Sequence, residues 1–83
     1  MELGRRSPDD GAVPGPPSLT KFGARLREAR EGQGLTQEQV AERSGVHATE
    51  VSRIEAGKRD PKVSTLLRLA AALSVSAGSL LEQ

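Results

Sequence analysis

Residues 35–57 have the sequence LTQEQVAERSGVHATEVSRIEAG. Apolar residues recur at helical spacing on both sides of a break at Gly45-Val46, which predicts two short helices joined by a turn. Neither segment is long enough to be stable as an isolated helix. Their apolar positions predict that both helices pack against one core, as is typical of a helix-turn-helix. These positions are Leu35, Val40, Ala41, Val46, Val51 and Ile54.

The second of these helices, predicted over residues 48–56, has an unusual outward face. It is formed by Ala48, Thr49, Ser52, Arg53 and Ala56. Because this face is small and polar and carries one arginine, it fits a groove of DNA better than it fits a core. It also lacks the large apolar anchors by which a helix docks against another protein.

The ends of both helices carry local signals. Thr36 is predicted to cap the first helix, and Gln39 follows three residues later to complete a capping box. Gly45 suits the left-handed backbone that a tight turn between helices needs, and Gly57 is predicted to end the second helix.

The composition limits the chemistry that the chain can perform. Its 83 residues make one domain at most and include no cysteine and a single histidine. These counts exclude a disulfide framework, a thiolate metal site and a histidine cluster, and the remaining polar residues form no recognisable catalytic constellation. We therefore expect no enzyme, no catalytic residue, no metal and no cofactor.

Charge and hydropathy give weaker indications. No apolar run is long enough to span a membrane, and no apolar stretch follows Arg5 and Arg6, so we expect no membrane anchor, no signal peptide and a cytoplasmic location. The formal net charge of +1 attracts a nucleic acid only weakly. A local basic rim is nevertheless predicted over residues 53–62, with an ordinary solvated surface as the alternative.

Residues 1–18 differ in composition from the rest of the chain. They hold four of the five prolines and three of the nine glycines, and few of them are apolar. Such a segment cannot bury enough surface to offset its ordering entropy, so it is predicted to be a disordered tail. The alternative is a basic arm that reaches DNA through Arg5 and Arg6, although acidic residues counter both charges.

Residues 19–83 are predicted to form the folded domain. The first helix begins at Leu19, places Phe22, Leu26 and Ala29 on one stripe, and ends at the glycines of residues 32–34. A strongly apolar fourth helix is predicted over residues 63–73, and a short fifth helix over residues 76–81. With no strand pattern, the fold class is all-α with five helices.

Residues 20–81 resemble the Cro/C1-type helix-turn-helix domain of lambdoid phage repressors, the XRE family. The resemblance rests on the joint register of Leu35-Thr36-Gln37, Ala41, Gly45, Val46, Ser52, Ile54-Glu55-x-Gly57, Pro61 and Leu69-Ala70-x-x-Leu73. It implies a five-helix, lambda-repressor-like fold with helices two and three as the helix-turn-helix. It also implies sequence-specific binding of double-stranded DNA by a transcriptional regulator, with a repressor as first choice.

Glu55 is expected to lean toward the interior, where a carboxylate needs a partner. The resemblance implies that this partner is Arg30 of the first helix. The favoured interpretation is a structural pair that ties the first and third helices together.

The resemblance also implies that the helix at residues 48–56 lies in the major groove. Arg53 is then the strongest candidate for base recognition, because its fork matches guanine O6 and N7; the alternative is a surface pair with Glu50. Thr49 and Ala48 can contact a thymine methyl group. Glu50 can accept from a cytosine amino group or deter wrong sequences by repulsion.

A second set of residues is predicted to contact phosphates, which set affinity but carry no sequence information. The set is Gln37, Ser52, Lys58, Arg59 and His47. His47 occupies a position where relatives commonly have a Ser or Thr helix cap, so it is a poorer cap. The alternative for His47 is a merely exposed loop residue.

The predicted partner is an inverted-repeat operator bound by a homodimer, since one recognition helix covers few base pairs. The expected dimer surface is Val75, Leu80 and Leu81, unless all three pack into the monomer core. Three alternatives stay open: an antitoxin that binds DNA and a toxin protein, a helical protein-interaction module that binds no DNA, and a domain excised from a longer regulator.

Overall fold

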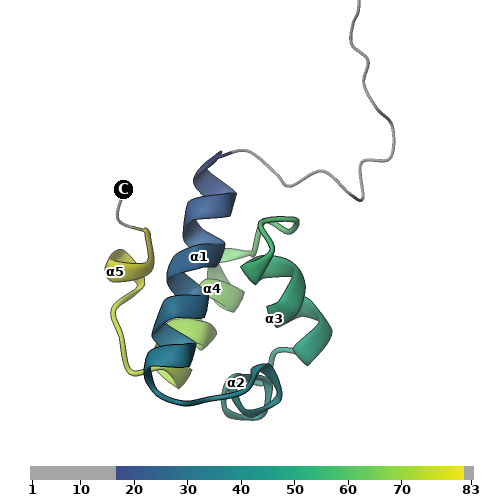
Figure 1. Ribbon diagram of the computed structural model, residues 1–83, viewed down its shortest axis with the longest axis vertical. Coiled ribbons are helices and arrows are strands. Elements are labelled where there is room, and N and C mark those ends of the chain that lie inside the picture. The colour runs from purple at the N-terminus through teal and green to yellow at the C-terminus, as the bar shows by residue number, and fades with distance from the viewer. Residues whose placement is uncertain (1–16, 82–83) are drawn as a thin grey trace, which may run out of the picture.

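The structure, a computed structural model, describes residues 17–81, which form five helices and no strand. In chain order these are α1 (Pro17–Gly32), α2 (Gln37–Ser44), α3 (Ala48–Glu55), α4 (Val63–Ala72) and α5 (Ala77–Leu81). The predicted all-α, five-helix fold with α2 and α3 as the helix-turn-helix is confirmed. Helix α1 runs through the middle of the molecule, with α4 behind it, α3 on one side and α5 on the other (Figure 1).

Helix α1 begins two residues before the predicted start at Leu19. Proline is favoured in the first turn of a helix, because its φ is already helical and its missing N–H has no helical partner to lose. Pro17 and Ser18 therefore belong to α1 rather than to the predicted tail. The rest of that prediction, together with the arm hypothesis for Arg5 and Arg6, lies outside the described residues.

One core joins all five helices. Its fully buried side chains are Leu26, Val40, Val51, Ile54, Leu69 and Leu73. Of the apolar positions predicted for the helix-turn-helix, all are buried except Ala41, which is half-buried. Both short helices are thus held by tertiary packing, as their length requires.

The C-terminal part of the fold exposes apolar residues that differ in part from those predicted for a dimer surface. Helix α4 is strongly apolar in sequence, but only one of its faces meets the core. Val63 and Leu67 lie one turn apart, with 70% and 54% of their surface exposed. Leu80, expected at a dimer surface, is buried, and Val75 packs against the core. Leu81 is 51% exposed.

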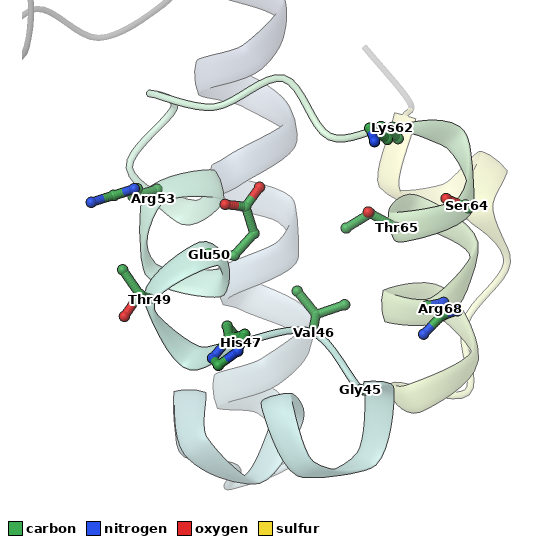
Figure 2. Close-up of a pocket in the computed structure, with 10 residues that line it drawn as sticks. All are labelled: Gly45, Val46, His47, Thr49, Glu50, Arg53, Lys62, Ser64, Thr65 and Arg68. Atoms are coloured by element: carbon green, nitrogen blue, oxygen red, sulfur yellow. The ribbon is translucent and has the colours of Figure 1, made fainter.

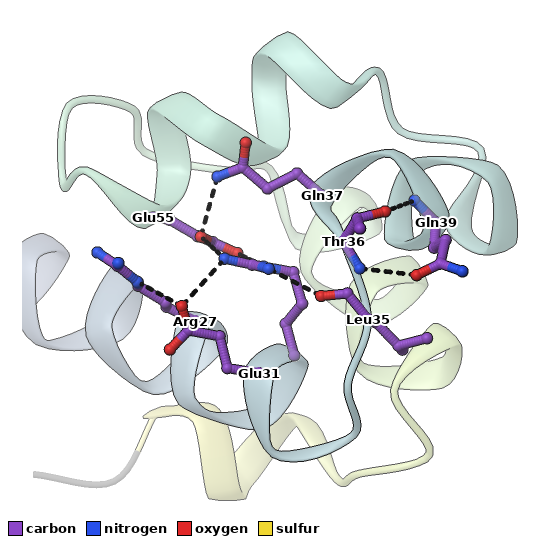
Figure 3. A network of polar contacts seen from close by, with 8 residues as sticks. Arg27, Glu31, Leu35, Thr36, Gln37, Gln39 and Glu55 are labelled. Carbon is purple, nitrogen blue, oxygen red and sulfur yellow. Dashed lines mark hydrogen bonds and ion pairs between the residues drawn. The ribbon is translucent and has the colours of Figure 1, made fainter.

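The turn into and out of α2 follows the predicted local chemistry. Gln39 N donates to Thr36 Oγ1 at 3.0 Å, and Thr36 N donates to Gln39 Oε1 at 2.8 Å, which completes the capping box (Figure 3). Gly45 ends α2 with φ of 77°, and its N–H donates to the Ala41 carbonyl at 2.9 Å. This left-handed residue sets the angle at which α3 leaves α2.

Helix α1 approaches the C-terminal end of α3 at Gly23. A Cβ built on Gly23 would lie 2.6 Å from the Glu55 carbonyl oxygen and closer still to that of Ile54. Glycine is therefore required there by close backbone contact, a role that the sequence analysis missed. This contact restricts the position of α3 relative to α1.

Candidate nucleic-acid interface

The outward face of α3 contains the residues predicted for it. Thr49, Ser52, Arg53 and Ala56 are exposed, whereas Val51 and Ile54 on the opposite face are buried. Ala48, at the start of the helix, is half-buried. The helix therefore presents small and polar groups and one long cation to solvent.

His47 precedes α3 without capping it. It makes no side-chain hydrogen bond to the first turn, as predicted for a histidine at this position, and its side chain is exposed. The first backbone N–H groups of α3 have no side-chain acceptor and remain available to an external one.

A hollow of about 510 Å³ lies between α3, the turn before it and the first two turns of α4 (Figure 2). Ten residues line it: Gly45, Val46, His47, Thr49, Glu50, Arg53, Lys62, Ser64, Thr65 and Arg68. Its lining contains three long cations, Arg53, Lys62 and Arg68, and a single carboxylate, Glu50. This excess of positive charge suits an anionic ligand, despite the near-zero net charge of the chain.

The sequence analysis missed what α4 contributes to this hollow. Ser64 and Thr65 line it from the first turn of α4, and Arg68 lines it one turn later. Arg68 Nη1 also approaches the turn between α2 and α3, where it would lie 3.3 Å from a Cβ on Gly45. The polar face of α4 in the sequence was the available signal, but only the packing of α4 against α2 shows where that face points.

Glu50 is paired with Arg59 rather than with its helical neighbour. Arg59 Nε lies 3.3 Å from Glu50 Oε1, with 44% and 30% of the two side chains exposed. Within residues 17–81, the Arg53 side chain makes no hydrogen bond or ion pair. The alternative that Arg53 forms a surface pair with Glu50 is not what the structure has.

Arg30 and Glu55 form a bidentate ion pair between α1 and α3. Arg30 Nε donates to Glu55 Oε2 at 2.7 Å, Nη2 donates to Oε1 at 3.0 Å, and Nη1 donates to the Leu35 carbonyl at 2.8 Å. Only 11% and 4% of the two side chains are exposed. The hydrogen bonds that Arg30 donates to Glu55 raise the pKa of Arg30 above its usual value despite burial.

Gln37 joins the same network from the first turn of α2. Its Nε2 donates to Glu55 Oε1 at 3.1 Å, so the amide predicted to meet a phosphate is turned toward the core carboxylate (Figure 3). The remaining predicted phosphate contacts are nearer solvent. Ser52 and Lys58 are exposed, and Lys58 follows Gly57, whose φ of 74° turns the chain away from α3.

Two further observations concern the described residues only. Residues 17–81 contain no group of three or more His, Cys, Asp or Glu side chains that could hold a metal ion. The same part of the chain has no helix that is long and apolar enough to cross a membrane.

Comparison with known proteins gives consistent matches. A family model described as helix-turn-helix matches residues 26–80. The chain is 48% identical over 58 residues to the HTH-type transcriptional repressor RghR of Bacillus subtilis (strain 168), a match that covers 69% of this chain and 43% of that protein. It is 43% identical over 56 residues to the control protein C.SmaI of Serratia marcescens, covering 68% of this chain and 67% of that protein. The chain thus spans less than half the length of RghR.

Solved structures agree with these matches. The restriction-modification controller protein C.AhdI from Aeromonas hydrophila superposes with a TM-score of 0.73 at 42% sequence identity. This superposition covers 75% of this chain and 94% of that one. The five-helix arrangement is therefore shared over most of the length of a controller protein.

Proposed function

The chain belongs to the helix-turn-helix family of DNA-binding transcription regulators, and we propose that it acts as a repressor that reads the major groove with α3. The observation that carries this proposal is the exposed face of α3 beside a hollow lined by three cations. A helix of this width fits the major groove, and the cations are placed to meet the phosphates that border it.

Base recognition is assigned to the outward face of α3, from Ala48 in its first turn to Arg53 in its last turn. Arg53 is exposed and unpaired within the described residues, so its fork is available to guanine O6 and N7. Thr49 and Ala48 contact thymine methyl groups in this arrangement. Glu50 lies beside them, but its carboxylate is paired with Arg59, so we assign it no base contact of its own.

Phosphate contacts are assigned to two groups around α3. The first group contains four of the residues inferred from the sequence: Gln37, His47, Ser52 and Lys58. Arg59, the fifth residue of that set, is paired with Glu50 instead. The second group, Lys62 and Arg68, is added because both line the hollow beside α3. For Gln37 the contact comes from the backbone at the N-terminus of α2, because its side chain is engaged with Glu55.

Selection of bound duplexes from a random-sequence pool tests this function. A preferred sequence should emerge, and its affinity should fall steeply with salt, by roughly 0.9 in the log–log slope for each phosphate neutralised. No selected sequence, or an affinity that does not depend on salt, would refute DNA recognition.

We further infer that two copies bind an inverted repeat. One recognition helix reads only a few base pairs, and two-fold related helices require half-site centres about 34 Å apart. Of the surface expected from the sequence, Leu81 is exposed, and the exposed apolar residues Val63 and Leu67 take the place of Val75 and Leu80. A second copy is the occupant proposed for them.

A further inference from the structure

Glu50 and Arg53 are three positions apart on α3, so their side chains are neighbours on one helix face. A carboxylate at this spacing is the nearest acceptor for an arginine. The structure nevertheless directs the Glu50 carboxylate to Arg59, in the loop after α3, at 3.3 Å. In Figure 2 the Arg53 side chain extends away from the Glu50 carboxylate.

We propose that Arg59 is a positioning residue for Arg53: by holding Glu50, it keeps the Arg53 guanidinium free to recognise guanine. This inference rests on the proposed function, namely binding of duplex DNA through α3. It assigns to Arg59 a role different from the phosphate contact inferred from the sequence.

The energetics of the pair support a positioning role over a stabilising one. An ion pair with 44% and 30% of its side chains exposed contributes little to folding, because water screens it. The same weak attraction is sufficient to decide which of two arginines a single carboxylate holds. Arg59 does not line the hollow, whereas Glu50 and Arg53 do. Arg59 therefore contacts Glu50 from the loop after α3, and Arg53 stays at the surface of α3 that would face DNA.

Loss of Arg59 should therefore have an indirect effect. Glu50 would then pair with Arg53, and that pair must break before Arg53 can reach a base. When the base is not guanine, Arg53 makes no base contact, so the Glu50–Arg53 pair does not have to break. The preference for guanine should fall for this reason, and not only the overall affinity.

The test begins with the preferred duplex selected for the wild-type protein. The base pair that loses its preference in Arg53→Ala is identified first, and every later variant is measured at that base pair by fluorescence anisotropy. Arg59→Ala should lower the preference there roughly two- to fivefold, the range expected from an exposed competing pair. Arg59→Lys should retain part of it.

The decisive variant is Arg59→Ala combined with Glu50→Gln. With no carboxylate to capture Arg53, the guanine preference lost in Arg59→Ala should return. Lys58→Ala is the matched control, because it removes a neighbouring loop cation that has no ion pair with Glu50 within the described residues. It should weaken all duplexes alike and lower the salt slope by about 0.9, and Glu50→Gln should not rescue it.

The outcomes distinguish a failure of this inference from a failure of the proposed function. If the wild-type protein selects no duplex, the proposed function fails and the role of Arg59 fails with it. If the wild-type protein is specific but Arg59→Ala behaves like Lys58→Ala, Arg59 is a phosphate contact and only this inference is overturned. A loss of preference that Glu50→Gln does not restore overturns it as well.

Discussion

Gln37 donates a hydrogen bond from Nε2 to Glu55 Oε1 at 3.1 Å, so the first residue of α2 is joined to the last residue of α3. Through Glu55 both helices are tied to Arg30 of α1. The helix-turn-helix is therefore held by a buried polar network as well as by its apolar core. Such a network restricts the relative placement of the three helices because each bond has a preferred geometry.

The first prediction concerns this network. Glu55→Ala should lower the free energy of unfolding by about 3 kcal/mol, because it leaves the Arg30 guanidinium buried without its carboxylate. Urea denaturation measures the loss. The double variant with Arg30→Ala should lose less than the sum of the two single variants. An unchanged unfolding midpoint for Glu55→Ala would contradict the importance of the pair.

The second prediction concerns the close approach of α1 to α3. Gly23→Ala should cost about 2 kcal/mol or more, because the added methyl group meets the backbone carbonyls of Ile54 and Glu55, which cannot move aside as a side chain can. Gly32→Ala is the matched control on the same helix: nothing lies within 4 Å of its added Cβ. It should be neutral or stabilise by roughly 0.5 kcal/mol. Equal thermal midpoints for both variants would show that the helices separate freely.

The third prediction distinguishes base recognition from phosphate contact. Arg53→Ala should cost about 1–3 kcal/mol on the selected duplex and abolish preference at one base pair. Lys58→Ala should weaken every sequence about equally. Binding titrations against single-base variants of the selected duplex provide the comparison. A uniform loss in Arg53→Ala would move Arg53 to the phosphate contacts.

The fourth prediction comes from the hollow beside α3. Arg68→Ala should lower the affinity for all duplexes and reduce the salt slope by about 0.9, since Arg68 lines the hollow from α4. Arg27→Ala is the control, because Arg27 lies on α1, does not line the hollow and is paired with Glu31 at 3.1 Å. Its slope should equal that of the wild type. If both variants change the slope alike, the effect of Arg68 is one of overall charge.

The fifth prediction tests dimeric binding. Leu67→Glu should weaken association of two copies on an inverted repeat, because it introduces a charge on the exposed apolar side of α4. Ala24→Glu adds the same charge at an exposed position of α1 and should have no effect. Sedimentation on the palindromic duplex reports the stoichiometry. A stable one-to-one complex of the wild-type protein at saturation would exclude the dimer.

Much of the fold could be predicted because its signals are local. The capping box of Thr36 and Gln39, the left-handed turn at Gly45 and the apolar spacing around Val51 each depend on residues within a few positions of one another. Whether such a cap, turn or helix forms depends on nearby residues and little on the rest of the fold. The number of helices and the position of the helix-turn-helix follow from such signals.

The remaining features depend on residues far apart in the chain. The sequence alone determined five helices, a helix-turn-helix and a polar outward face on α3. Only the tertiary structure decided that Gly23 meets the backbone of Ile54 and Glu55. The same holds for Arg68, which lines the hollow beside α3, and for Glu50, which pairs with Arg59 rather than with Arg53. The physical reason is that a side chain chooses among partners brought close by packing, and a helical period specifies which face a residue occupies but not what that face meets.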